Sequence, residues 1–194
     1  GPVGLRGIAE RIHALTAILA TGLRRLGHTV IHPHFFDTLR VGVANGMDAD
    51  RVMTLAAERR INLRRIDDRT VGLSLDQTVA HDDVADLLDV FNGGEEYDVS
   101  FEDLQNETVI GYPEPFERTS AYMTHPIFNR HHSETEMLRY MKSLEDKDIA
   151  LNFSMIPLGS CTMKLNATSE MIPVTWPEVG MIHPFAPIDQ TEGY

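Results

Sequence analysis

The sequence is poor in cysteine and in long hydrophobic runs, and each shortage excludes a class of protein. One cysteine among 194 residues cannot form an internal disulfide, so a secreted disulfide scaffold is excluded and an intracellular setting is expected. No apolar run approaches the roughly 20 residues that cross a bilayer, and no signal peptide opens the chain. Because the sequence starts with Gly1 and ends without a closing element, we expect it to be part of a longer protein.

Positive charge is scarce as well. The sequence has 17 Lys and Arg against 29 Asp and Glu, which gives a formal net charge of -12 at pH 7. A nucleic-acid backbone or an anionic membrane surface is bound by clustered basic residues, so neither is expected as a partner. The remaining composition, with 42% hydrophobic and 24% charged residues, is typical of a globular protein with a core.

Hydrophobic periodicity predicts an α+β arrangement over residues 1–91. A stripe with helical spacing, from Ile8 to Leu26, predicts one long helix that ends before Gly27. Asp48 or Asp50 is expected to cap a later helix. The predicted elements are a helix at 3–26, an extended piece at 28–32, a strand at 38–43, a helix at 49–59, strands at 61–66 and 70–75, and a helix at 81–91. After the long helix, this β-α-β-β-α order predicts a small antiparallel sheet with helices on one face.

The stretch that follows lacks such regular patterns. Residues 92–120 are rich in Gly, Pro, Asp and Glu without sustained periodicity, and we interpret them as an interdomain linker that wraps a surface. Beyond residue 152, frequent prolines exclude a long helix, except around 166–171.

One helix is predicted between these two irregular stretches. The motif Ser133-Glu-Thr-Glu136 is a capping box, in which the first and last side chains satisfy exposed amides at a helix start. It predicts a helix at 134–146. The apolar side chains at helical spacing are expected to form its buried stripe: Met137, Met141 and Leu144.

The segment with the most reactive side chains is the loop at 155–166. Backbone amides near Ser160 and Thr162 can hold a carboxylate or a phosphate, and the alternative is a turn whose hydroxyls bond their own backbone. Cys161 lacks a local catalytic signature and is more typical of a small buried hydrophobic residue. Lys164 either pairs with an anion or is a solvated surface lysine.

The histidines match no metal-binding motif. His32 and His34 flank a proline, and His131 and His132 are adjacent, and neither spacing fits a zinc site. We interpret both pairs as structural and predict no metal. His125 precedes a proline that restricts its backbone, and such a fixed imidazole is a candidate for contact with a site. The sequence also lacks a Walker loop.

Several motifs resemble the P-protein family of the glycine cleavage system, the decarboxylating glycine dehydrogenases. The motifs are Gly4-Leu-Arg-Gly-Ile-Ala-Glu-Arg-Ile-His, Phe36-Asp-Thr-Leu, Thr124-His-Pro-Ile-Phe-Asn-Arg-His-His-Ser-Glu-Thr-Glu, Ile156-Pro-Leu-Gly-Ser-Cys-Thr-Met-Lys-Leu-Asn and Met171-Ile-Pro-Val-Thr-Trp-Pro-Glu. The resemblance covers essentially the whole chain, and the run from Pro157 to Lys164 is its most specific part.

The resemblance implies a fold and a division of the chain. The family is built from two similar halves, each of which resembles a fold-type I pyridoxal-phosphate enzyme. Residues 1–91 are then expected to be a connecting helix and the small C-terminal subdomain of the first half. Residues 92–120 are expected to be the linker. Residues 121–194 are expected to be the largely irregular and helical N-terminal segment of the second, catalytic half.

The resemblance also implies an activity. Members of the family decarboxylate glycine with pyridoxal phosphate, release CO2 and pass the aminomethyl group to the lipoyl arm of H-protein. The expected partners are glycine, lipoylated H-protein, the remainder of the enzyme and a second copy in a homodimer. The expected location is the cytoplasm of a bacterium, or the mitochondrial matrix if the source is eukaryotic.

The resemblance further implies that the chain holds no catalytic residue. The family's Schiff-base lysine lies beyond Tyr194, so the chain alone is expected to be inactive and not to hold the cofactor. Lys142, Lys147 and Lys164 do not stand in that lysine motif. The chain is expected to contribute one wall of the substrate or cofactor pocket, formed by Ser160, Cys161, Thr162, Lys164 and Asn166, with His125 and Arg118 as weaker candidates.

Two other interpretations remain open. The β-α-β-β-α order also resembles small amino-acid-binding regulatory modules, which accounts for residues 28–91 but not for 124–194. The second alternative is a structural half-domain without catalytic function.

Overall fold

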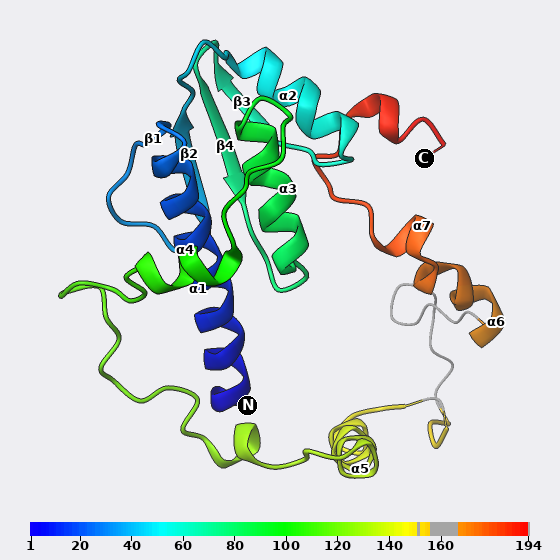
Figure 1. Ribbon diagram of the computed structural model, residues 1–194. Coiled ribbons are helices and arrows are strands. Elements are labelled where there is room, and N and C mark those ends of the chain that lie inside the picture. The colour runs from blue at the N-terminus through cyan, green and yellow to red at the C-terminus, as the bar shows by residue number, and fades with distance from the viewer. Residues whose placement is uncertain (151, 156–166, 194) are drawn as a thin grey trace. The chain divides into compact units, whose positions relative to one another are not determined.

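The computed structural model describes residues 1–150, 152–155 and 167–193 (Figure 1). The chain forms two units, residues 1–128 and residues 129–194. The first unit contains a four-stranded antiparallel sheet and four α-helices, and the described part of the second contains three α-helices and no strand. The predicted α+β class is confirmed. None of the helices in the described ranges is both long and apolar enough to cross a membrane.

Helix α1 (Pro2–Arg25) confirms the long helix that the apolar stripe predicts. Pro2 stands in its first turn, where a missing N–H costs nothing. Gly27 follows the helix with φ +85°, a left-handed conformation that glycine adopts without strain. The helix is buried only from Ile12 onward, while Ile8 is 47% exposed, so its first two turns extend past the core.

The sheet joins four strands in the order β1-β2-β4-β3. They are β1 (Thr29–Val30), β2 (Thr38–Gly42), β3 (Arg64–Asp67) and β4 (Thr70–Ser74). The predicted hairpin of the last two strands is confirmed, but β3 begins at Arg64 and not at Ile61. The reason is the end of the preceding helix: Arg60 has φ +62°, and the Ile61 amide donates to the Ala56 carbonyl at 2.8 Å. The amide of Ile61 therefore completes a helix end and does not pair in the sheet.

The other two helices of the β-α-β-β-α order also form as predicted. Helix α2 (Ala49–Glu58) is capped by Asp48, whose carboxylate accepts from the Arg51 amide at 2.8 Å, which decides between the two candidate caps. Helix α3 (His81–Phe91) has the predicted bounds. In its first turn, Asp83 accepts a hydrogen bond from the Ala80 amide at 2.7 Å.

All three helices contribute to one hydrophobic core on one face of the sheet. The sheet side of the core is formed by Leu39, Val41, Val71 and Leu73, and the helix side includes Leu19, Leu23, Val52, Leu88 and Phe91. Each of these large side chains contributes about 1.5–3 kcal/mol by burial. Helices α1 and α3 are in close contact at Gly22, where an added Cβ would lie 2.5 Å from a methyl carbon of Leu88.

A further helix lies within the predicted linker. Helix α4 (Phe101–Glu107) packs on α1 and buries Leu104, which is 1% exposed. Ser100 caps it by accepting from the Asp103 amide at 3.1 Å. The lack of periodicity in residues 92–120 did not predict this helix, and their interpretation as an interdomain linker stays a prediction. The predicted domain boundaries stay predictions.

The described part of the second unit contains α5 (Glu134–Glu145), α6 (Thr168–Met171) and α7 (Pro177–Gly180). Helix α5 confirms the predicted helix at 134–146, and α6 is a short helix of four residues within 166–171, the range in which the prolines allow one. Ser133 caps α5, since its hydroxyl accepts from the Glu136 amide at 3.2 Å. The Glu136 carboxylate accepts from the amide of His132 at 3.1 Å, one residue before the position that a capping box predicts.

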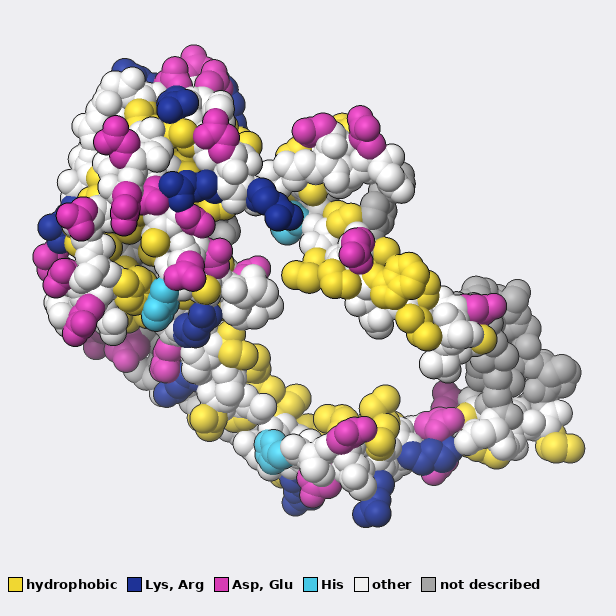
Figure 2. All heavy atoms as spheres, turned by 45° about the vertical axis from the view of Figure 1, so that its right-hand side comes forward, with side chains coloured by type: hydrophobic (Ala, Val, Ile, Leu, Met, Phe, Trp, Pro, Cys, Tyr) yellow, Lys and Arg dark blue, Asp and Glu magenta, His cyan; other side chains and the backbone are white. Residues whose placement is uncertain are grey.

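The predicted burial of the α5 stripe is wrong. Met137, Met141 and Leu144 are 44%, 57% and 43% exposed. Their spacing places them on one helix face, but no described element of the second unit covers that face. Ala150 is the one buried residue among the described residues of this unit. Figure 2 shows a group of hydrophobic side chains open to solvent on the helical turns after residue 167.

Candidate functional site

The predicted pocket wall falls mostly outside the described residues. This applies to Ser160, Cys161, Thr162, Lys164 and Asn166, so their proposed contacts with substrate or cofactor stay predictions.

The two remaining candidates, Arg118 and His125, make local contacts. The Arg118 Nε donates to the Ser120 carbonyl at 3.3 Å, and its guanidinium lies 5.1 Å from the centre of the Tyr122 ring. His125 Nδ1 accepts from the Ile127 amide at 3.2 Å. Each side chain therefore stabilises its own turn, and a role in a pocket wall stays a prediction for both.

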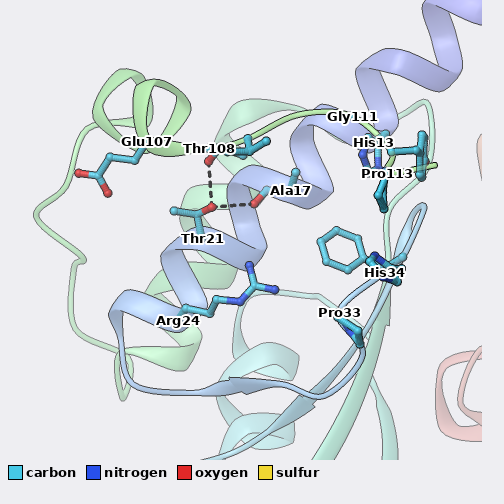
Figure 3. A pocket seen from close by; sticks show the side chains of 13 residues that line it. His13, Ala17, Thr21, Arg24, Pro33, His34, Glu107, Thr108, Gly111 and Pro113 are labelled. Carbon is cyan, nitrogen blue, oxygen red and sulfur yellow. Dashed lines mark hydrogen bonds between the residues drawn. The ribbon is translucent and has the colours of Figure 1, made fainter. Parts of the chain in front are cut away.

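The structure shows a different cavity in the first unit, of about 340 Å³, which the sequence did not predict (Figure 3). It lies between α1, the segment after β1 and the segment after α4. Its lining residues are His13, Ala17, Thr21, Arg24, Pro33, His34, Phe35, Glu107, Thr108, Val109, Gly111, Tyr112 and Pro113. A cavity of this size is at the lower end of the range for small-molecule sites.

A pair of hydroxyls joins two walls of this cavity. Thr108 Oγ1 lies 2.9 Å from Thr21 Oγ1 and 2.6 Å from the carbonyl oxygen of Leu104. The Thr21 hydroxyl in turn donates to the Ala17 carbonyl at 3.1 Å, as the dashed lines in Figure 3 show. These bonds fix the segment after α4 against α1, so this part of the cavity is held in place by both helices.

His13 and Tyr112 form a stacked pair in another part of the wall. Their ring centres are 4.3 Å apart with an angle of 22° between the planes. His13 is only 7% exposed, and its Nδ1 lies 3.0 Å from the Phe36 carbonyl oxygen. Because a carbonyl only accepts, Nδ1 carries the proton in this bond. The histidine is thus oriented by the chain segment that it contacts.

The hydroxyl of Tyr112 is buried without a partner among the described residues. Burial raises the pKa of this phenol, and the nearby Asp37 carboxylate raises it further, so the hydroxyl keeps its proton. The ring can stack on His13 without the hydroxyl. The hydroxyl is therefore a hydrogen-bond donor that the described part of the chain leaves unused.

Of the two charged side chains that line the cavity, one is paired within the described residues and the other is not. Glu107 is paired with Arg25, with 3.1 Å between carboxylate oxygen and guanidinium nitrogen. Arg24 reaches from α1 into the space beside Pro33 and His34 (Figure 3), and no acceptor in the described ranges pairs with its guanidinium. The cavity therefore contains one uncompensated positive charge. No group of three or more His, Cys, Asp or Glu in the described ranges is arranged to hold a metal ion.

The sequence contains a pattern that could have predicted one wall of the cavity. His13, Ala17, Thr21 and Arg24 follow one another at spacings of four, four and three, which places them along one face of α1. The opposite wall comes from residues 107–113, almost a hundred positions further along the chain. No local pattern predicts that these two segments meet.

Comparison with known proteins shows which proteins this chain is similar to. Residues 1–91 match the family model of the glycine cleavage system P-protein. The whole chain is 54% identical over 194 residues to glycine dehydrogenase (decarboxylating) of Cupriavidus metallidurans, and it covers 20% of that protein. It is 53% identical over 200 aligned positions to glycine dehydrogenase (decarboxylating) of Paraburkholderia xenovorans, again covering 20% of it.

Residues 1–91 are thus similar to the glycine cleavage system P-protein family, and the whole chain is similar to one segment of these two relatives. It spans about a fifth of the length of the curated relatives that it matches. The resemblance predicted from the motifs is confirmed.

Proposed function

We propose that this chain is a segment of a P-protein that decarboxylates glycine and transfers the remaining aminomethyl group to the lipoyl arm of H-protein. The observation that carries the proposal is the 54% identity over all 194 residues, which includes the second unit that the family model does not reach. A homodimeric assembly and the cellular location stay predictions from the resemblance.

The family's cofactor, pyridoxal phosphate, supplies an electron sink for the carbanion that decarboxylation creates. A lysine that binds its aldehyde must present a neutral amine. Lys142 does not fit, because its ammonium lies 2.9 Å from both Glu145 and Asp146, and hydrogen bonds to these carboxylates raise its pKa. Lys147 lies exposed on the turn after α5 and lines no described cavity. The described residues therefore do not fit the Schiff-base role.

In this proposal, the cofactor is bound by parts of the P-protein that the relatives have in addition to this segment. The segment alone releases no CO2 from glycine. Its contribution is positional: the hydroxyls and amides near Ser160 and Thr162, with Lys164 or Asn166, orient the substrate carboxylate, the cofactor phosphate or the lipoyl arm.

The activity is tested with the full-length protein and lipoylated H-protein. We expect release of CO2 from glycine labelled at its carboxyl carbon, and formation of an aminomethylated lipoyl group. The 194-residue chain in the same assay is expected to release none. Absence of both products with the full-length protein would show that the proposed activity is wrong.

The positional role is tested separately with Ser160→Ala and Thr162→Ala in the full-length enzyme. Loss of a hydrogen bond to a charged group lowers kcat/KM for glycine by about tenfold. Ser143→Ala is the matched control, because the Ser143 hydroxyl donates only to the Tyr140 carbonyl of its own helix. If the Ser160 and Thr162 variants keep both steady-state constants, the positional role is wrong even if the activity is present.

A further inference from the structure

Helix α5 has an apolar face that no described element of the second unit covers. Met137, Met141 and Leu144 lie within about 60° of one another around the helix axis, because each residue of an α-helix turns by about 100°. Leu138 lies at one edge of this stripe, and all four side chains are exposed. We call these four residues the apolar face of α5.

The opposite side of the same helix is polar. Arg139 and Ser143 lie there, and Lys142 lies between the two sides, where it pairs with Glu145 and Asp146 at 2.9 Å each. Helix α5 is therefore amphipathic, with its apolar residues gathered on one side. This pattern is typical of a helix that packs on a core with one face and meets water with the other.

The length of α5 makes a covering surface necessary. The helix has 12 residues, and isolated helices of this length are only marginally stable in water. The Ser133 cap and the ion pairs of Lys142 are local contacts, and water and salt screen exposed ion pairs. Most of the stability of such a helix comes from packing of its apolar face. A partner surface that is always present meets this need better than one that comes and goes.

The length of the relatives indicates where this surface lies. Similarity continues over all 194 residues, including α5, and the chain covers only 20% of each relative. Four fifths of each relative therefore lie outside the segment, on the same polypeptide. A surface on the same polypeptide meets α5 at a high effective concentration, whereas a second copy or a separate protein loses translational freedom on binding. A carrier that leaves after each turnover also favours a more polar interface.

We propose that the apolar face of α5 packs permanently against an apolar surface of the P-protein outside these 194 residues. This inference rests on the proposed function only in making the chain a segment of a P-protein. It does not depend on which reaction that protein catalyses.

The test compares amide hydrogen exchange in residues 134–145 between the 194-residue chain and the full-length protein, measured by mass spectrometry under the same conditions. We expect exchange at least about 100-fold slower in the full-length protein, because opening α5 then requires breaking a packed interface. Helix α3 is the internal control. It is buried in the core of the first unit, so it is expected to be equally protected in both proteins.

Variants of the full-length protein assign the protection to the apolar face. Met141→Glu places a charge in the interface and is expected to speed exchange in α5 at least about tenfold. Ser143→Glu is the matched control, because it adds the same charge on the polar side of the same helix. Met141→Ala is a milder second variant, with an expected change of about threefold. Unchanged exchange in α3 shows that each variant is folded.

Four results would overturn the proposal. The first is equal exchange of α5 in the two proteins. The second is protection that is lost when the full-length protein dissociates into monomers in sedimentation experiments, which would assign the face to a second copy. The third is protection that appears only when H-protein is added. The fourth is equal protection in Met141→Glu and Ser143→Glu.

The same experiment separates this inference from the proposed activity. Protection of α5 in a full-length protein that releases no CO2 from glycine supports the interface and contradicts the activity. Release of CO2 without protection of α5 supports the activity and overturns the interface.

Discussion

Phe91 is 1% exposed in the core of the first unit, whereas Phe185 in the second unit is 89% exposed. The same contrast holds for most large apolar side chains of the two units. Fixing the backbone of one residue costs about 1–2 kcal/mol, and the first unit offsets this cost by burying its side chains between helices and sheet. The described part of the second unit has almost no such burial, so its helices depend on caps, turns and ion pairs of their own.

The largest expected effect on the free energy of unfolding comes from replacing Phe91, the buried member of this pair of phenylalanines, by alanine. Phe91→Ala removes a buried ring and is expected to lower the free energy of unfolding by about 3–5 kcal/mol. Phe185→Ala is the matched control and is expected to change it by less than about 0.5 kcal/mol. Urea unfolding followed by circular dichroism measures both. Equal losses in the two variants would show that the second unit buries its apolar side chains in solution.

Low pH is expected to destabilise the first unit through protonation of His28. This ring is 4% exposed, its Nε2 lies 2.8 Å from the Phe91 carbonyl oxygen, and its Nδ1 accepts from the Ala44 amide at 3.1 Å. Burial lowers its pKa below the usual 6.5, against the opposing effect of the Phe91 carbonyl. The unfolded chain then binds more protons than the folded chain as the pH falls below 6.5. Stability is therefore fully present above that pH and is lost toward the lower folded-state pKa.

The slope of unfolding free energy against pH measures this effect. A single such histidine contributes at most about 1.4 kcal/mol per pH unit. His28→Gln is expected to reduce the slope below pH 6.5, whereas His183→Gln, at an exposed position of the second unit, is expected to leave it unchanged. A slope that persists in His28→Gln would assign the acid sensitivity to another group.

A smaller effect is expected from removing the cap of α5. Ser133→Ala leaves the Glu136 amide without its side-chain partner and is expected to destabilise this helix by about 1 kcal/mol. Amide hydrogen exchange in residues 134–145 measures the loss. Because no core formed by described residues supports α5, exchange should accelerate throughout the helix. Faster exchange confined to the first turn would show that something else holds the rest of the helix.

The smallest expected effect concerns the ion pair between Arg25 and Glu107. Both side chains are about half exposed, at 41% and 52%, so water and salt screen the pair. Arg25→Gln is expected to cost less than about 1 kcal/mol in urea unfolding. A loss comparable to that of Phe91→Ala would mean that this pair, and not the buried leucine of α4, holds α4 on α1.

The two units also differ in how far sequence reasoning reaches. In the first unit, the apolar stripe of α1 and the pattern of α3 predict both helices closely, because a helix face that packs on a core must be apolar at each turn. In the second unit, the same reasoning predicts α5 correctly but not its exposure. Periodicity shows which face of a helix is apolar, and it does not show whether anything covers that face.

The other features that the sequence did not predict are a short helix and a cavity formed by segments far apart in the chain. Helix α4 has seven residues and one fully buried side chain, Leu104, which is too little for a periodic pattern. The cavity combines α1 with residues 107–113, and only the fold brings these segments together. The predicted pocket loop at 155–166 was recognised by its resemblance to the family, and nearly all of it lies outside the described residues.

The exposed start of α1 has a consequence for the order of folding. The Tyr122 hydroxyl donates to the carbonyl oxygen of Pro2 at 2.5 Å, across 120 positions of sequence. Closing so long a loop is entropically costly unless the intervening chain is already compact, so this contact forms after the sheet and helices have assembled. Its loss should therefore speed unfolding rather than slow folding. In stopped-flow experiments, Tyr122→Phe is expected to shift the unfolding limb and to leave the refolding limb in place.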